Sequence, residues 1–227
     1  MLLGGANIAF AEESGGFVGI GIGGGGTELK SDFDGSDGIS DHSKRKDSGI
    51  SYGFVAGYKQ FFNDYLGLRY YANLDIYHNI SSTSFYYPGS PDERFPAKKG
   101  EIVIINYGVN VDFLGNFVST EIADFGGFVG FGIGGTTLAG KFINDFKNLI
   151  EEGNGDKFNA TTGFDIWLNI GLRTNIAKYH GIELVARVPF LPVKMIDLKT
   201  NEDGYSFKQK QTLGQQYNIL ARYTFSF

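Results

Sequence analysis

The sequence contains no cysteine, and only five prolines, two methionines and one tryptophan occur among its 227 residues. Without cysteine, neither a disulfide framework nor a thiolate metal site can form. Basic residues are scarce as well, because 20 lysines and arginines stand against 25 acidic residues. A nucleic-acid-binding protein normally has a basic face, so we expect no nucleic-acid partner.

Long apolar runs are also missing. The uncharged run from Phe125 to Gly140 has 16 residues, and seven of them are glycine. A membrane helix needs about 20 apolar residues, and each glycine disfavours helix by about 1 kcal/mol relative to alanine. The sequence therefore predicts no membrane-spanning helix.

Glycine and aromatic residues, in contrast, are abundant, with 34 glycines, 21 phenylalanines and 13 tyrosines. Many of them belong to eight segments in which apolar and polar residues alternate. These segments are 16–27, 49–61, 65–79, 101–115, 125–138, 163–176, 181–188 and 215–227. Such alternation is typical of strands with one apolar and one polar face, so we predict eight strands.

The connections between these strands alternate in length. Short connections lie at 62–64, 116–124 and 177–180, whereas long polar ones lie near 28–48, 80–100, 139–162 and 189–214. Sequential hairpins of this kind close into a barrel without a free edge. The sequence thus predicts an all-β fold over 12–227, an eight-stranded antiparallel up-and-down β-barrel. In the third long connection, the helical spacing of Phe142, Phe146, Leu149 and Ile150 predicts a short helix. We prefer a helix that caps the lumen to one that presents a partner-binding face.

Periodicity alone leaves two barrels open, a soluble ligand carrier with its apolar face inside and a transmembrane barrel with that face outside. Most predicted strands exceed the roughly 9 to 11 residues that a tilted strand needs to cross a membrane. Their polar faces carry charges of both signs in nearly equal number, as a lumen filled by ion pairs requires. The candidate lumen residues are Lys59, Arg69, Asp75, Asp112, Asp165, Arg173, Glu183, Arg187 and Arg222. We therefore predict a transmembrane β-barrel in contact with membrane lipid.

Both ends of the chain carry features of an exported protein. Residues 1–11 are apolar, and Ala9 and Ala11 fit a signal-peptidase site. We predict a signal-peptide remnant there, with an ordinary apolar N-terminus as the alternative. At the other end, Tyr223, Phe225 and Phe227 resemble the assembly signal of bacterial outer-membrane barrels. We therefore predict a bacterial outer-membrane location, with the barrel-assembly machinery as a partner of the C-terminal strand.

Glycine rows on two predicted strands have a structural interpretation. Segments 16–27 and 125–138 present glycines to the proposed lumen, from strands that lie opposite each other in an eight-stranded barrel. The interior of such a barrel is just wide enough for side chains to fill. We infer that the glycines make room for long charged side chains, and that Trp167, on the polar side of its strand, helps to fill a narrow lumen.

Two glycine patterns match the dinucleotide-binding motif G-x-G-x-x-G, one starting at Gly19 and the other at Gly130. That motif needs a strand before it and a helix after it, so that the helix N-terminus binds the pyrophosphate. Both patterns lie instead within strand-like alternation. We therefore expect no cofactor.

Acidic residues and histidines suggest two further sites. Asp32, Asp34 and Asp37 offer calcium ligands, but the EF-hand spacing fails, and we prefer a solvated acidic loop to a weak surface calcium site. His78, at the rim of the predicted barrel, is the candidate for catalysis of the kind that outer-membrane acyltransferases and proteases perform. A surface histidine is the commoner explanation, so we expect no enzymatic activity.

Several longer blocks of the sequence are specific enough to compare with known families. They are 67–71 (GLRYY) with Asp75 and His78, 107–117 (YGVNVDFLGNF), 126–137, 169–175 (NIGLRTN) and 180–184 (HGIEL). These blocks resemble the Helicobacter outer membrane protein family, the Hop-related group. The resemblance implies an outer-membrane β-barrel whose relatives include host-cell adhesins and porins. The sequence lacks the long cysteine-bearing passenger region of the large adhesins, so no receptor-binding residue is carried over.

Two functional hypotheses follow from these observations. The first is a surface-exposed barrel with a structural or adhesive role, which acts through its extracellular loops on a possible host-surface ligand and whose lumen is largely filled by ion pairs. The second is a narrow porin for small ions or solutes. In a porin, the ion selectivity would depend on the candidate lumen charges Arg69, Asp75, Asp112, Arg173, Glu183 and Arg187. Balanced charges that attract each other across a narrow barrel favour the first hypothesis.

Overall fold

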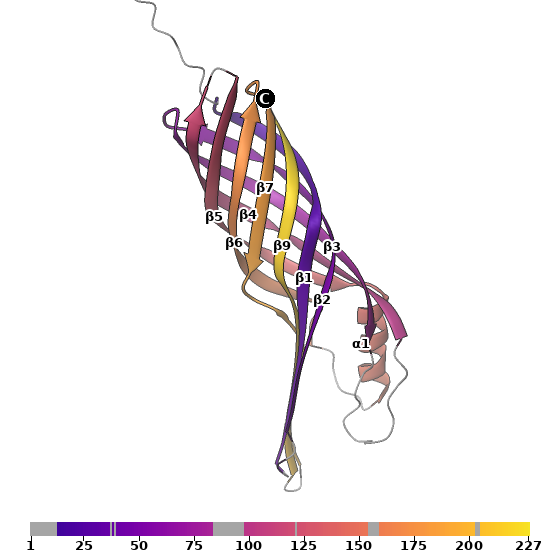
Figure 1. The fold of residues 1–227 in the computed structure, drawn as a ribbon. Coiled ribbons are helices and arrows are strands. Elements are labelled where there is room, and N and C mark those ends of the chain that lie inside the picture. The colour runs from indigo at the N-terminus through magenta and orange to yellow at the C-terminus, as the bar shows by residue number, and fades with distance from the viewer. Residues whose placement is uncertain are drawn as a thin grey trace, which may run out of the picture.

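The computed structural model describes residues 13–36, 38, 40–83, 98–120, 122–153, 159–202 and 205–227. The predicted signal-peptide remnant (1–11) and most of the second long connection (84–97) lie outside the described residues. Nine strands and one helix occur in the described part of the chain (Figure 1). Their bounds are β1 Gly15–Gly35, β2 Ser40–Phe61, β3 Leu66–Thr83, β4 Lys98–Ser119, β5 Ala123–Ala139, α1 Lys141–Gly153, β6 Thr162–Ile176, β7 His180–Pro189, β8 Val193–Glu202 and β9 Tyr205–Ser226.

Eight of the strands close into a ring. The strands pair in the order β1-β2-β3-β4-β5-β6-β7-β9, and β1 pairs with β9 to complete the circle. Every pairing is antiparallel, and β8 joins the free edge of β9 outside the ring. The predicted eight-stranded antiparallel β-barrel is therefore confirmed, and Figure 1 shows its tilted strands wrapping around a common axis.

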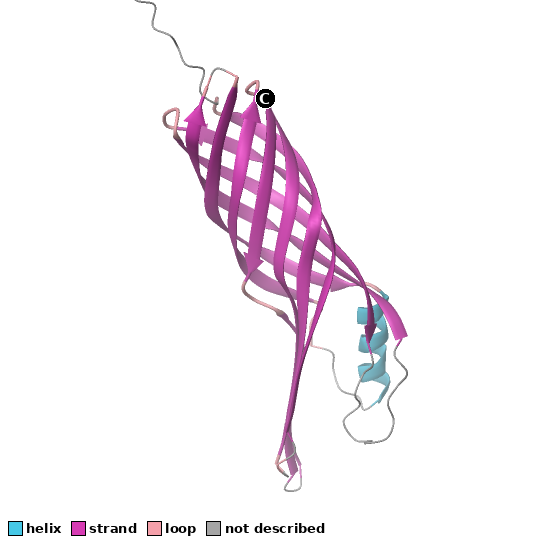
Figure 2. Cartoon of the chain, in the orientation of Figure 1, coloured by secondary structure: helices cyan, strands magenta, loops and turns pink. Residues whose placement is uncertain are grey.

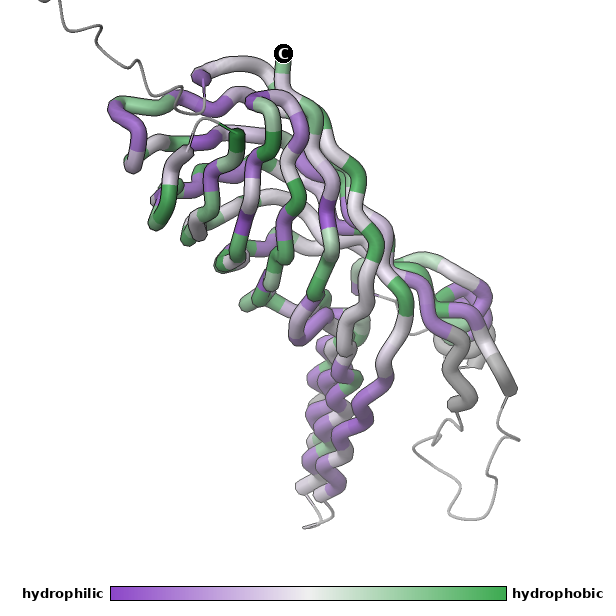
Figure 3. Tube along the Cα trace, turned by 45° about the horizontal axis from the view of Figure 1, so that its top comes forward, coloured by the Kyte–Doolittle hydropathy of each residue, from purple (hydrophilic) through white to green (hydrophobic). Residues whose placement is uncertain are grey.

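The apolar face of the barrel points outward. Ile20, Val109 and Phe131 are 58%, 58% and 61% exposed, whereas the charged residues that alternate with them are buried. Figure 3 shows the alternation of hydrophobic and hydrophilic residues along the barrel strands. An exposed apolar band around a polar interior is the arrangement of a membrane barrel and the reverse of a soluble carrier.

Two of the expected long connections are largely strand. Beyond the barrel, residues 28–35 of β1, 40–48 of β2, 193–202 of β8 and 205–213 of β9 pair in the order β2-β1-β9-β8. We call these four segments the strand extension, and it projects from the end of the barrel opposite the C-terminus (Figures 1 and 2). The prediction of loops at 28–48 and 189–214 was wrong there, because polar residues on both faces hide the alternation while cross-strand pairs still satisfy the backbone.

The expected short helix in the third long connection is present as α1. Phe142, Ile143 and Phe146 are buried on one side of it, as their helical spacing predicts. In the described residues no helix is both long and apolar enough to cross a membrane.

Candidate functional site in the barrel interior

All nine candidate lumen residues lie inside the barrel. Each of them is at most 6% exposed. They alternate along their strands with the outward apolar residues, so their positions follow directly from the period of two. The interior is therefore a place where five cations and four carboxylates of this set share a small, enclosed volume.

One chain of ion pairs crosses this interior. Arg69 Nη2 lies 2.8 Å from Asp112 Oδ2, and the two residues face each other in the β3–β4 ladder. Arg69 Nη1 also pairs with Glu183 on β7, and Arg222 Nη1 on β9 lies 3.3 Å from the second oxygen of Glu183. Because β3 and β7 stand on opposite walls of the ring, the Arg69–Glu183 pair spans the lumen.

Three inward aromatic rings enclose the Arg69 guanidinium. The centroids of Phe128, Tyr71 and Phe17 lie 4.5, 5.0 and 5.6 Å from its Cζ atom. The negative face of an aromatic ring attracts a guanidinium, and the attraction is stronger where water is excluded. These rings hold Arg69 in the geometry that reaches both carboxylates.

A second cross-barrel contact lies nearer the strand extension. Arg187 on β7 pairs with Asp75 on β3, again between opposite walls. Arg187 Nε also donates a hydrogen bond to Asn169 Oδ1 at 2.9 Å, and Asn73 Nδ2 donates to Asp75 Oδ2 at 2.8 Å. The ion pair is thus bound into a wider network of amides.

Asparagines and the single tryptophan complete that network. Asn110 Oδ1 accepts hydrogen bonds from Trp167 Nε1 at 2.6 Å and from Asn169 Nδ2 at 2.9 Å. Asn110 Nδ2 in turn donates to Asn73 Oδ1 at 2.8 Å. The expectation that Trp167 helps to fill the lumen is confirmed, since its side chain is 1% exposed.

The glycine row of β5 makes this packing possible. Gly132 stands between Asn110 on β4 and Trp167 on β6 in the two ladders, and a Cβ atom there would overlap both side chains. At Gly130 a Cβ atom would overlap the Asp112 carboxylate. The inferred role of these glycines, to leave room for side chains from neighbouring strands, is therefore confirmed for β5.

The remaining candidate lumen residues have other partners. Arg173 Nη2 donates to Asn116 Oδ1 at 2.9 Å, and its Cζ lies 5.2 Å from the centroid of Phe61. Asp165 accepts hydrogen bonds from the backbone nitrogens of Ile166 at 2.7 Å and Leu191 at 3.0 Å. The carboxylate of Asp165 therefore fixes the chain that follows β7.

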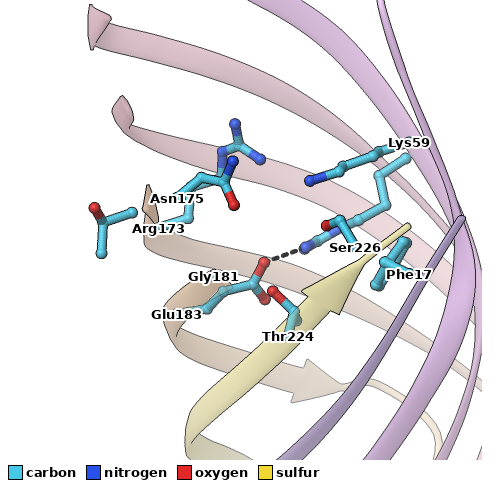
Figure 4. A pocket seen from close by; sticks show the side chains of 10 residues that line it. Phe17, Lys59, Arg173, Asn175, Gly181, Glu183, Thr224 and Ser226 are labelled. Carbon is cyan, nitrogen blue, oxygen red and sulfur yellow. Dashed lines mark hydrogen bonds and ion pairs between the residues drawn. The ribbon is translucent and has the colours of Figure 1, made fainter. Parts of the chain in front are cut away.

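A small cavity remains at the end of the barrel that holds the C-terminus. Lys59, Arg69, Arg173 and Glu183 contribute its charged lining (Figure 4). Its volume is about 10 Å³, which is near the minimum for one water molecule. The Arg69–Glu183 pair bounds this cavity, and the Arg187–Asp75 pair lies further toward the opposite end.

An apolar cluster fills the opposite end. Asn106 on β4 donates to Gln215 Oε1 on β9 at 2.6 Å, across the ring. Ile104 and Leu213 each lie two residues nearer the strand extension than this pair, on the same two strands. Both belong to one buried cluster, so the cluster reaches from β4 to β9 across the ring. Its other members are Tyr77, Ile102, Leu138, Phe142, Ile143, Phe146, Val193, Met195 and Ile196.

The sequence prediction missed this cluster and the inward aromatic residues. Phe17, Tyr71 and Phe128 share the inward parity of the glycines and charged residues beside them, and so do Ile102 and Ile104. The alternation of each strand places these apolar residues inward, so the signal that identifies them is present in the sequence.

The other candidates considered from the sequence lie away from the lumen. His78 Nε2 lies 2.8 Å from Glu101 Oε1, and both side chains are exposed. His42 Nδ1 lies 3.0 Å from Asp32 Oδ1 in the strand extension, and Asp37 lies outside the described residues. In the part of the chain that the structure describes, no group of three histidine, aspartate or glutamate side chains is arranged to hold a metal ion.

The three C-terminal aromatic residues are exposed. Tyr223, Phe225 and Phe227 are 44%, 41% and 71% exposed. Their outward position on the last strand places them among the lipid-facing side chains. The Tyr223 hydroxyl also lies 2.7 Å from His180 Nδ1 on β7.

Comparison with known proteins agrees with this architecture. A family model described as Helicobacter outer membrane protein matches residues 53–227. The chain belongs to the Helicobacter outer membrane protein family. It is therefore an outer-membrane β-barrel, and its exposed apolar band contacts the lipid of that membrane.

Solved structures with a similar fold come from several bacteria, although no curated protein sequence matches the chain. Neisserial surface protein A is 12% identical with a TM-score of 0.44, over 95% of this chain and 100% of that one. OprG from Pseudomonas aeruginosa is 13% identical with a TM-score of 0.46, over 96% and 98%. Ail, the attachment invasion locus protein of Yersinia pestis, in complex with the heparin analogue sucrose octasulfate, is 12% identical with a TM-score of 0.34, over 92% and 99%.

Proposed function

We propose that this family member is a non-conducting barrel that presents the strand extension at the cell surface, in a structural or adhesive role. The observation that carries this proposal is the filled interior. Two ion pairs between opposite walls, Arg69–Glu183 and Arg187–Asp75, lie in series with the apolar cluster. A solute on its way through the barrel would have to displace all three.

Displacement of the ion pairs is costly. A buried charge that loses its partner is destabilised by about 3 to 5 kcal/mol, because water does not replace the lost interaction. An eight-stranded barrel has little room for both its own side chains and a hydrated ion. The charge network therefore supports a closed lumen better than a selectivity filter.

The direction of the barrel follows from its two ends. In outer-membrane barrels the short turns face the periplasm and the longer connections face outward. The turns at 62–65 and 177–179 lie at the end of the barrel that holds the C-terminus, and the strand extension lies at the opposite end. We accordingly propose that the extension faces the exterior, where it can meet a host-surface ligand.

Single-cysteine variants test this orientation, because the natural chain has no cysteine. Ser40→Cys lies at the far end of the extension, and Asp64→Cys lies in the turn between β2 and β3. A membrane-impermeant maleimide should label Ser40→Cys on intact cells, and Asp64→Cys only after the outer membrane is permeabilised. The opposite labelling pattern would reject surface display of the extension.

A narrow porin is the second candidate. Some buried polar atoms have no hydrogen-bond partner among the described residues, including Asp75 Oδ1, Arg187 Nη2 and Arg222 Nε. Unpaired polar atoms along the interior favour sites for water, and a continuous file of such sites would conduct small ions. This candidate predicts reproducible conductance steps, which the closed barrel does not.

A further inference from the structure

The outward face of the strand extension continues the lipid-facing surface of the barrel. In the ladders, Lys44 on β2 faces Lys30 on β1, Lys30 faces Thr212 on β9, and Thr212 faces Lys194 on β8. Residues in direct register share one face of a sheet. This set, which we call the lysine row, places Lys44 and Lys30 side by side and Lys194 one strand beyond Thr212, and it contains no acidic residue.

The neighbouring rows on the same face are balanced. In the row next to it and nearer the barrel, Lys46 faces Glu28. The row next to it and farther from the barrel contains acidic and basic residues, namely His42, Asp32, Lys210 and Asp197. The row beyond that, Ser40, Asp34, Lys208 and Lys199, has two lysines and one aspartate. The lysine row therefore has the largest excess of positive charge on this face.

The lysines of this row are poorly neutralised within the protein. Lys30 Nζ lies 2.8 Å from Glu28 Oε1, and this hydrogen bond holds the pKa of Glu28 below its usual value. Lys46 Nζ lies 3.9 Å from the other oxygen of Glu28, so two lysines share this carboxylate. Among the described residues, neither Lys44 nor Lys194 has an ion-pair partner. Like charges in direct register repel each other, which favours an external anion.

The lysine row lies just beyond the membrane. On the outward face of β2, Ile50 is 52% exposed and is the last apolar residue before the extension. The six residues from Ile50 to Lys44 span about 20 Å along a strand, or about 14 Å along the normal of a membrane crossed at 45°. The headgroup layer is about 5 to 8 Å thick on each side, so the backbone of the row lies beyond it. Lysine stems that extend along the protein surface toward the membrane bring their ammonium groups to the outer edge of this layer.

We propose that the lysine row, Lys30, Lys44 and Lys194, binds phosphate groups of lipid headgroups at this end of the barrel. Lysine binds phosphate as a compact point charge. Three strands supply one lysine each, so the site depends on the four-stranded β2-β1-β9-β8 sheet. The bound phosphate would offset the repulsion within the row and anchor the base of the strand extension to the membrane surface.

Lipid selectivity of the refolded full chain tests the proposal. The protein is reconstituted in phosphatidylcholine vesicles that contain a minor share of phosphatidic acid. Electron paramagnetic resonance then compares the immobilised fractions of spin-labelled phosphatidic acid and spin-labelled phosphatidylcholine. We expect the natural chain to favour phosphatidic acid by about fivefold or more, since each lysine near an anionic surface contributes about that factor.

A matched pair of variants locates the effect. K30Q/K44Q/K194Q should reduce the selectivity ratio to about one. K199Q/K208Q/K210Q removes the same charge from rows farther out and should keep the natural ratio. Unchanged mobility of the folded band in heat-modifiability gels confirms that both variants fold, as expected for exposed lysines.

Three outcomes would overturn the proposal. They are an unchanged ratio in the first variant, an equal loss in both variants, and loss of selectivity when inorganic phosphate is added at constant ionic strength. The second outcome would indicate a general charge effect, and the third a site for soluble phosphate.

Discussion

At Gly132 the absence of a side chain determines how the interior packs. The Trp167 indole reaches over this residue to donate to Asn110 Oδ1 at 2.6 Å, and Asn110 then connects to the rest of the amide network. Any larger residue at this position would occupy the space of the hydrogen bond.

Gly132→Ala should therefore destabilise the barrel. The added methyl group separates Trp167 from Asn110 and leaves buried polar atoms unpaired, at a cost of about 1 to 3 kcal/mol. Gly115→Ala is the matched control, since nothing lies within 4 Å of a Cβ atom at Gly115. Urea unfolding in lipid vesicles, followed by Trp167 fluorescence, measures both. Equal stability of the two variants would contradict the packing described for β5.

Glu183 is the residue on which the charge network depends most. Its two oxygens contact Arg69 and Arg222 from different strands. Glu183→Gln removes the charge but keeps the shape, and it leaves two buried guanidinium groups with less compensation. We expect a loss of about 3 to 5 kcal/mol in the free energy of unfolding.

The exposed Glu101 provides the comparison for this prediction. Glu101 pairs with His78 at 2.8 Å, with its side chain 50% exposed. Glu101→Gln should change stability by less than about 1 kcal/mol, because solvent screens a surface pair. If the Glu183 and Glu101 variants unfold at the same urea concentration, the interior pairs do not hold the barrel together.

Much of this interior could be predicted from the sequence, because a strand places alternate residues on opposite faces. That rule alone put Lys59, Arg69 and the other charged candidates inside, where the structure has them. It does not specify partners, since Arg69 reaches Glu183 across a lumen whose width depends on closure of the ring. Nor does it distinguish Asp165, which binds backbone amides, from Asp75, which binds an arginine.

Among the elements, β9 has the most connections. It pairs with β1 along almost its whole length, with β7 in the barrel and with β8 in the strand extension. As the last strand, it closes the ring against the first. We propose that Tyr223, Phe225 and Phe227, on its lipid-facing side, are the signal that the barrel-assembly machinery recognises.

Phe227→Ala tests this role at the level of the element. Phe227 is 71% exposed and follows the last residue of β9, so its loss should leave refolding into vesicles unchanged. Insertion into the outer membrane of cells should fall several-fold. Tyr217→Ala, on the same outward face of β9, serves as the control and should insert normally. Equal insertion of the two variants would remove the C-terminal residue from the signal.

The strands of the extension could not be predicted from the alternation of apolar and polar residues. Its outward face is charged, and its inward face mixes apolar residues such as Leu29 and Phe33 with polar ones. Stability there comes from the ladders and from contacts such as the stacked rings of Phe33 and Phe207, whose centroids lie 6.0 Å apart. These contacts join segments far apart in the chain, which a local window of sequence does not register.

At the scale of the whole molecule, three features lie in series along the barrel and support the proposed closed lumen. A cavity of about 10 Å³ lies at the end of the barrel that holds the C-terminus. The two cross-barrel ion pairs come next along the barrel, and the apolar cluster lies beside the strand extension. A lumen closed by charges alone would open once both ion pairs broke. Here an ion would also have to cross apolar side chains, which bind water poorly.

Single-channel recording of the refolded protein in a planar bilayer tests the closed lumen most directly. Folding is verified beforehand by the heat-modifiable mobility of the barrel, and a porin recorded under the same conditions shows that conductance is detectable. We predict a silent bilayer for the natural chain. Reproducible conductance steps, with an ion selectivity that shifts in Arg69→Ala or Asp112→Ala, would contradict the closed barrel and identify the protein as a porin.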